Sequence, residues 1–209
     1  MKIALIGASG HAGSEILKEA VDRGLDVTAV VRNKGKLKLD VLTIEKDLFT
    51  LTKDDLAPFD VIVDAFNAPA GKETLHQDSI QHLVDLLQGS GKRLIVVGGA
   101  SSLFLDADRT NRMIDGVAPD APFYPTAHNM WLGLKDLLDS QDLDWTYLSP
   151  AAYFNPNGAK TGEFKLSDDR MIHNHAGKSE VSMGNYAIAL VDEIENPQHI
   201  QQHFSVVDA

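Results

Sequence analysis

Short runs of β-branched and other apolar residues alternate with longer amphipathic stretches through residues 1–150. The runs are almost continuously hydrophobic, which is typical of strands covered on both faces. Strands that alternate with helices form βαβ units, and these units build a parallel sheet. The pattern therefore predicts an α/β protein with a Rossmann-like, doubly wound, mostly parallel sheet flanked by helices.

The element bounds follow from the period of the apolar residues. Strands are expected at residues 2–7, 26–31, 41–45, 60–65, 93–98 and 144–148. Helices are expected at residues 13–23, 72–88 and 123–140, with Gly24 ending the first of them.

The chain becomes richer in glycine and proline after Pro150. Residues 162–175 are expected to form a hairpin with its turn at 167–169, followed by a helix at 185–194 and a strand at 203–207. A chain of 209 residues that is 44% hydrophobic suits one α/β domain. We expect a single domain over 1–209, in which residues 151–182 form a small substrate-side cap.

Composition excludes several classes of function. There is no cysteine, and no run of about 18 apolar residues that would cross a membrane. The N-terminus lacks the separate basic, apolar and cleavage regions of a signal peptide. A net charge of −11 repels phosphate backbones and anionic lipids. The expectation is a cytoplasmic protein with no nucleic-acid or membrane partner.

Three glycines, Gly7, Gly10 and Gly13, follow the first strand in the pattern G-x-x-G-x-x-G. Glycine allows a turn directly off a strand, a close approach of the backbone to a pyrophosphate, and tight packing of the next helix. Ser9 and His11 add polar donors. A tight turn without a ligand is the alternative, but the position in the first βα turn favours a dinucleotide site.

The second strand ends in Arg32, followed by Asn33 and Lys34. An acidic residue at this place would bind the ribose 2′-hydroxyl of NAD, whereas an arginine can bind the 2′-phosphate of NADP. A solvated arginine is the alternative. We therefore expect NADP, with NAD as the second cofactor to consider.

Several motifs together resemble a known group. They are "GASGHAG", "VVRN", "DVIVDAFNAP", "RLIVVGGASSL" and "LDWTYLSPAAYF". This combination resembles the atypical short-chain dehydrogenase/reductases, and more narrowly the NmrA-like NAD(P)H-binding proteins often labelled NADH-flavin reductases. The resemblance extends over nearly the whole chain, including "GEFKL" and "VSMGNYA".

The resemblance implies a role for each matching position. The implied cofactor-binding residues are Gly7, Ser9, Gly10, His11, Ala12 and Gly13 at the pyrophosphate, Arg32 and Asn33 at the 2′-phosphate, Asp47 and Leu48 at the adenine, Ala65, Phe66 and Asn67 beneath the ribose, Gly98, Gly99 and Ala100 beside the nicotinamide, and Pro150 and Tyr153 beside its amide. No metal ligands are implied.

The chain departs from the family at the catalytic pair, Tyr-x-x-x-Lys. The tyrosine and lysine positions of that pair fall on Ala127 and Trp131. Tyr124 and His128 form a Tyr-x-x-x-His pair one turn earlier, so both are candidate proton donors. Pro125 supports the alternative that Tyr124 only precedes the helix. Two further departures are Ser149 where relatives carry arginine, and Asn185 where they carry aspartate.

Hydride transfer to a flavin or quinone demands less acid catalysis than carbonyl reduction, because a conjugated ring spreads the incoming charge. It needs a flat apolar slot beside the nicotinamide. The aromatic candidates for its walls are Phe104, Phe123, Trp131, Tyr153 and Phe154, with core packing as the alternative for each.

Polar residues near the expected strand ends leave further alternatives open. Ser101 and Ser102 can bind a substrate carbonyl or cap a helix. His173 and His175 share one face of a strand but have no third metal ligand nearby. Residues 102–122 form either a mobile lid or a static loop.

The leading hypothesis is an NADP-dependent reductase that transfers hydride to a flavin, a quinone or a similar small conjugated acceptor. The alternatives are a non-catalytic NmrA-like sensor of the dinucleotide redox state and an epimerase or dehydratase of nucleotide-linked sugars. The only protein partner that we consider is a second copy of the chain, in a homodimer.

Overall fold

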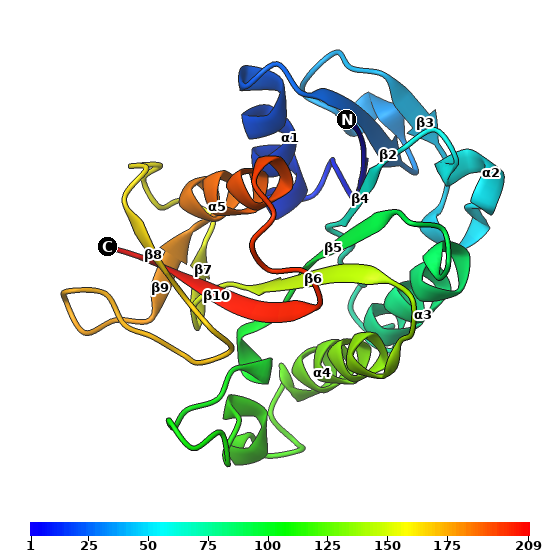
Figure 1. Ribbon diagram of the computed structural model, residues 1–209. Coiled ribbons are helices and arrows are strands. Elements are labelled where there is room, and N and C mark those ends of the chain that lie inside the picture. Colours follow the sequence, from blue (N-terminus) through cyan, green and yellow to red (C-terminus); the bar gives the residue numbers. More distant parts are fainter.

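The computed structural model describes residues 1–209 and is built around one eight-stranded sheet (Figure 1). The strand order is β3-β2-β1-β4-β5-β6-β10-β8. The strands are β1 (Lys2–Ile6), β2 (Asp26–Val31), β3 (Thr43–Glu45), β4 (Val61–Asp64), β5 (Arg93–Val97), β6 (Asp144–Ser149), β8 (Phe164–Ser167) and β10 (Gln202–Asp208). All neighbours are parallel except β8, which pairs antiparallel with β10. This order confirms the predicted Rossmann-like sheet.

Helices cover both faces of the sheet, as Figure 1 shows. They are α1 (His11–Asp22), α2 (Lys53–Leu56), α3 (Leu75–Leu87), α4 (Tyr124–Asp139) and α5 (Met183–Glu195). On one face α1 packs against α5, and on the other α3 packs against α4. Outside the expected hairpin at 162–175, the expected strands and helices are all present, with bounds shifted by a few residues. For example, α1 begins at His11, two residues before its predicted start.

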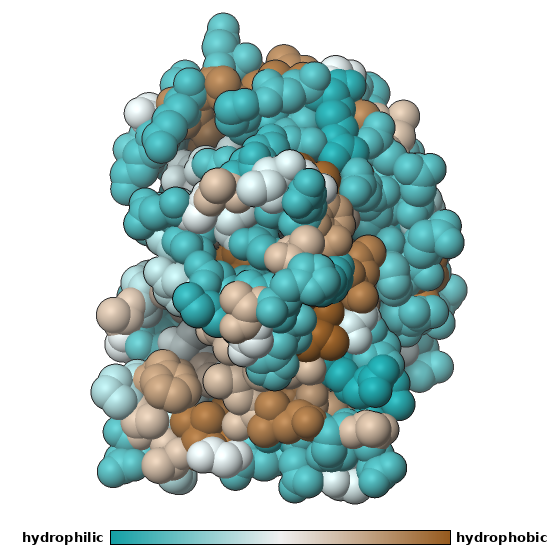
Figure 2. Space-filling model, turned by 90° about the vertical axis from the view of Figure 1, so that its left-hand side faces the viewer, coloured by the Kyte–Doolittle hydropathy of each residue, from teal (hydrophilic) through white to brown (hydrophobic).

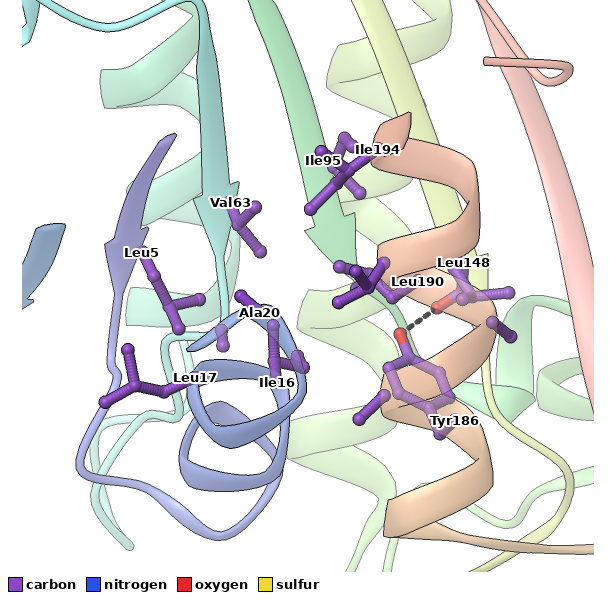
Figure 3. Close-up of a cluster of buried hydrophobic side chains, with 14 of the residues drawn as sticks. Leu5, Ile16, Leu17, Ala20, Val63, Ile95, Leu148, Tyr186, Leu190 and Ile194 are labelled. Carbon is purple, nitrogen blue, oxygen red and sulfur yellow. Dashed lines mark hydrogen bonds between the residues drawn. The ribbon is translucent and has the colours of Figure 1, made fainter. Parts of the chain in front are cut away.

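A buried apolar cluster joins α1 and α5 to the sheet (Figure 3). Ile16 and Leu17 of α1 and Leu190 of α5 are at most 2% exposed. Burial of such side chains stabilises the fold by about 1.5–3 kcal/mol each. The hydroxyl of Tyr186, also fully buried, donates to the carbonyl of Leu148 at 2.7 Å, so no polar group is left unpaired there. This packing makes the sheet a rigid support for the loops at its edge.

The predicted hairpin over residues 162–175 is wrong. β8 pairs with β10 instead of with the residues that follow it, and Leu166 lies opposite Val206. Beyond Ser167 the chain turns to Phe104, whose amide donates to Asp169 O at 2.9 Å. The hydroxyl of Ser205 fixes this path by donating to the carbonyls of Asp168 and Arg170. The partner is far away in sequence, and local turn signals do not reveal it.

A second, two-stranded parallel sheet was not predicted. It consists of β7 (Tyr153–Asn155) and β9 (Glu180–Ser182), each too short to give a periodic signal. The strands flank β8 in sequence and lie beyond the end of β6 (Figure 1).

Asn185, a departure from the family pattern, is fully buried at the start of α5. Its side-chain oxygen accepts from the amides of Thr161 and Gly162 at 2.9 Å. Its side-chain nitrogen donates to a carboxylate oxygen of Asp208 at 2.8 Å. The residue therefore ties the loop before β8 to both α5 and β10, and only a neutral amide can face both partners.

We expect Asn185→Asp to destabilise the protein at neutral pH by about 1–3 kcal/mol, because it replaces a donor to Asp208 with a second carboxylate. The carboxyl pair should have a raised pKa in the folded state. The folded state then binds the extra proton more tightly than the unfolded one, so the loss should shrink as the pH falls. Chemical denaturation at pH 7 and pH 5 measures this difference.

Asn157→Asp is the matched control, because the same charge enters an exposed loop. Equal losses for the two variants at both pH values would contradict the assigned role of Asn185.

Candidate nucleotide-binding and active site

A cavity of about 660 Å³ lies at the carboxyl ends of β1, β4, β5 and β6. Its size is within the range of roughly 300–1,000 Å³ that is usual for small-molecule sites. It is lined by Ser9, Gly10, His11, Ala12, Ala65, Phe66, Asn67, His76, Val97, Gly98, Gly99, Ala100, Ser101, Phe123, Thr126, Ala127, Met130, Pro150, Ala151, Ala152, Phe154 and Met183. Figure 2 shows this end of the molecule, where pale and brown residues gather in the lower half.

The loop after β1 depends on two glycines. Gly7 has a φ of +75°, and a Cβ there would lie 2.4 Å from the carbonyl oxygen of Ala65. A Cβ on Gly13 would lie 2.2 Å from the carbonyl oxygen of Gly7. Any side chain at either position would force the strand, the turn and the helix apart. Neither glycine lines the cavity, since both lie beneath the loop that does.

The N-terminus of α1 is left open to the cavity. Gly10 is its N-cap residue, no side chain caps the helix, and the first turn contains no acidic residue. The early amides and the positive end of the helix dipole are thus available to an anion. A pyrophosphate fits this arrangement, and Ser9, Gly10, His11 and Ala12 are the residues that would hold it.

The predicted adenosine-side residues lie outside the main cavity, at the ends of β2 and β3. Arg32 is exposed and forms no hydrogen bond or ion pair within the protein. The side chain of Asn33 accepts from the amide of Gly35 at 2.8 Å. Asp47 accepts from the amide of Phe49 at 3.0 Å, and Leu48 is buried. Arg32 is therefore a free guanidinium, whereas Asn33 and Asp47 also shape their own turns.

The loop after β5 brings bare backbone to the opposite end of the cavity. A Cβ on Gly98 would lie 2.2 Å from the ring of Tyr147, and one on Gly99 would lie 3.0 Å from the sulfur of Met130. The hydroxyls of Ser102 and Ser149 donate to the carbonyl of Gly99 at 2.7 and 2.8 Å. The Gly98–Ser101 loop is therefore fixed by these two hydrogen bonds on one side and lines the cavity on the other.

A histidine that sequence reasoning missed completes this support. His203 on β10 lies 2.8 Å from the hydroxyl of Ser149 through its Nε2 atom. Burial, with a smaller effect of Arg112, lowers the pKa of His203 to about 3, so the ring is neutral. Since Ser149 donates to Gly99, Nε2 of His203 must be the donor to Ser149. The serine that replaces the family arginine is therefore the centre of a buried polar network.

The predicted catalytic residues are placed in two different environments. Ser101 lines the cavity, and its hydroxyl has no partner within the protein. The rings of Tyr124 and His128 stack 5.3 Å apart, with 3.4 Å between the hydroxyl and Nδ1, but neither lines the cavity. Ala127, at the position of the family tyrosine, does line it.

Of the aromatic wall candidates, Phe123 and Phe154 line the cavity. Phe104 and Trp131 instead hold the guanidinium of Arg112 between them, 3.7 and 4.2 Å from their ring centroids. Such cation–π contacts stabilise by about 0.5–2 kcal/mol each. Tyr153 is 54% exposed and lies outside the lining.

The segment over residues 102–122 is anchored at several points. Arg109 forms ion pairs with Asp168 and Asp169 at 2.7 and 2.8 Å. Arg112 donates to the carbonyl of Ser102 in addition to its aromatic contacts. These contacts favour the static loop over the mobile lid.

His173 and His175 are exposed, and no group of three or more histidine, cysteine or acidic residues is arranged to hold a metal ion. None of the helices has both the length and the apolar character to cross a membrane.

The NAD(P)H-binding family model matches residues 7–197. The chain is 48% identical over 211 residues to the uncharacterized protein YwnB of Bacillus subtilis, covering 99% of this chain and 98% of YwnB. It is 42% identical to SP1627 of Streptococcus pneumoniae, suggested to be an NADH-flavin reductase, with a TM-score of 0.94 and full coverage of both chains. A Bacteroides thetaiotaomicron protein suggested to be an epimerase is 32% identical, with a TM-score of 0.85 and coverage of 99% and 96%.

The chain therefore belongs to the NAD(P)H-binding family. This confirms the resemblance at the level of the NAD(P)H-binding family. The open N-terminus of α1 after a turn that requires glycine is the kind of site that binds a dinucleotide phosphate.

We expect Gly7→Ala to abolish binding of a nicotinamide dinucleotide and to lower stability, because the new methyl group collides with Ala65. Gly24→Ala is the matched control, because Gly24 has a φ of +73° but nothing within 4 Å of its Cβ position. The control should lose about 1 kcal/mol from backbone strain alone and keep its affinity.

Thermal unfolding with and without NADPH measures both effects. Retention of the full ligand-induced shift in Gly7→Ala would contradict the assigned role of the loop.

Proposed function

We propose that this protein is an NADPH-dependent reductase that delivers hydride to a flat conjugated acceptor such as a flavin or quinone. The observation that carries the proposal is the cavity itself, which runs from the open N-terminus of α1 to the backbone of Gly98 and Gly99. Beyond those glycines its walls are largely apolar. The similarity to SP1627, suggested to be an NADH-flavin reductase, supports the same class of reaction.

Each end of the cavity would bind a different part of the reactants. The bound nicotinamide would supply the hydride. Ser9 to Ala12 would bind the pyrophosphate, and the Gly98–Ser101 loop would orient the nicotinamide with backbone groups and the free hydroxyl of Ser101. The support of Gly99 by Ser102 and Ser149 would keep that loop from moving under the ring.

The acceptor would enter between α4 and the residues after β6. Phe123 and Met130 come from the helix side, and Ala152 and Phe154 from the opposite side. We propose that residues 151–182 serve as a substrate-side cap on a single domain. A flat apolar slot of this kind excludes bulk water and aligns the two rings for hydride transfer.

Stopped-flow mixing of NADPH-loaded protein with FMN and a panel of quinones tests the function. We expect loss of NADPH absorbance that depends on acceptor concentration. NADPH binding without oxidation by any acceptor would overturn the reductase and favour the redox-sensor alternative.

The preference for NADP is a further part of the proposal and is supported by the free guanidinium of Arg32. Removing a charge-assisted contact of about 1.5–3 kcal/mol corresponds to a loss of about 10–100-fold in affinity. We therefore expect Arg32→Gln to weaken NADPH binding by that factor and to leave NADH binding unchanged.

Calorimetric titration with both cofactors measures this. Lys135→Gln is the charge-matched control, because Lys135 is exposed on α4 and forms no ion pair. Equal loss for NADPH and NADH in Arg32→Gln would contradict recognition of a 2′-phosphate by this residue.

A further inference from the structure

His76 is an unassigned polar group in the wall of the cavity. It is the second residue of α3, is 5% exposed and packs its ring against Phe66 with centroids 6.2 Å apart. Its ring nitrogens make no hydrogen bond within the protein, and its residue lines the cavity together with Gly98 and Met130. The His76 side chain is buried, yet its ring nitrogens are not among the polar atoms closed off from solvent without a partner, so they are open to a group that enters the cavity.

Asp64, the last residue of β4, lies behind this wall. It is 3% exposed, and its carboxylate accepts one hydrogen bond, from the amide of Phe66 at 3.0 Å. It has no cationic partner. Burial raises the pKa of Asp64 to about 6, against a smaller opposing effect of the Phe66 amide.

A small void connects the two residues. It has a volume of about 10 Å³, close to that needed for one water molecule. Its polar lining comes from Asp64, His76, Ser79 and Tyr147. The hydroxyl of Ser79 already donates to the carbonyl of His76 at 3.0 Å, and that of Tyr147 accepts from the amide of Gly99 at 3.1 Å. A water in this void would have Asp64 and the ring of His76 as its free polar partners.

We propose that His76 donates the proton that the acceptor requires, and that Asp64 replaces it through one water molecule held between the two residues. This inference rests on the proposed reductase function and identifies the proton source that the absent tyrosine–lysine pair would otherwise provide.

The protons move in one concerted relay. The ring N–H bond of His76 that faces the acceptor breaks as an O–H bond forms on the carbonyl oxygen of the quinone, while the other ring nitrogen takes a proton from the water and the water takes one from the carboxyl of Asp64. His76 is left as its other neutral tautomer and Asp64 as a carboxylate, and proton exchange with solvent through the open cavity restores both before the next turnover. The reduced dinucleotide is the only reductant, and the net uptake is one proton per hydride.

Few other titratable groups face the pair. His11 of α1 lines the same cavity as His76. Asp64 comes from β4 and Tyr147 from β6, while Glu73 precedes α3 and is the one charge that opposes the lowering of the pKa of His76 by burial. β5 and α4 contribute only Val96, Val97 and Met130 to the void. His76 is therefore neutral near pH 7. The fraction of Asp64 that is protonated then sets how readily His76 regains the proton that it donates. Turnover of a quinone should fall as the pH rises through about 6.

An NMR titration of the cofactor-free protein tests the pair without turnover. The His76 ring resonances should respond to the titration of Asp64, with an inflection near pH 6 that disappears in Asp64→Asn. An inflection that persists unchanged in Asp64→Asn would overturn the coupling.

Steady-state turnover of a quinone by the whole protein tests the donor role. His76→Gln should lower kcat by about 100-fold, a value typical of lost general acid catalysis, and should abolish the solvent isotope effect. Asp64→Asn should fold and keep activity at a reduced level that no longer varies near pH 6. His82→Gln is the matched control, because His82 lies on the same helix but packs on Phe49 outside the cavity.

The outcomes separate the two proposals. If the wild-type protein oxidises NADPH and His76→Gln matches His82→Gln, the donor role is wrong and the reductase stands. If the wild-type protein binds NADPH but none of the flavin and quinone acceptors oxidises it, the reductase and the donor role both fail. The melting temperature of each variant shows whether it is folded. If His76→Gln does not fold, the pH dependence of turnover in Asp64→Asn tests the proton path instead.

Discussion

The close approach of Gly13 to the carbonyl of Gly7, and of Gly7 to the carbonyl of Ala65, determines how the first strand, the first helix and β4 meet. It brings β1, β4 and α1 together without an intervening side chain. The N-terminus of α1 consequently points into the space beyond the carboxyl ends of the strands, where the sheet order reverses direction between β1 and β4. The cavity exists because this junction is so tight.

A second layer of contacts keeps the other end of the cavity in place. Ser102 and Ser149 donate to the carbonyl of Gly99, and His203 in turn donates to Ser149. The rings of Phe104 and Trp131 hold Arg112 and fix the segment that follows. These groups touch no cavity space themselves. Their effect is to present the Gly98–Ser101 backbone as a fixed surface, which is what ring-to-ring hydride transfer requires.

The parts of the structure that could be predicted from sequence are those encoded locally. The period of the apolar residues gave the strands and helices of the sheet, and the glycine spacing indicated the first turn. The residues that line the cavity at Ser9–Ala12 and Gly98–Ser101 come shortly after β1 and β5. The ends of these two parallel strands are therefore enough to place both segments at the carboxyl edge of the sheet.

The parts that could not be predicted depend on pairing across long distances. β8 finds its partner in β10, and the roles of Ser149 and His203 follow from the neighbours that β6 and β10 become in the sheet. His76 carries no motif at all. Only its position on α3, where it lines both the cavity and the small void that Asp64 also lines, distinguishes it from the other histidines.

We propose that the bare amides at the start of α1 bind the diphosphate of a nicotinamide dinucleotide. The most direct measurement is an NMR titration of isotope-labelled protein with NADP, followed at the amides of Gly10 to Gly13. We expect these amide resonances to shift first and farthest, together with those of Gly98 and Gly99. Binding that leaves the Gly10 to Gly13 amides unmoved would contradict it.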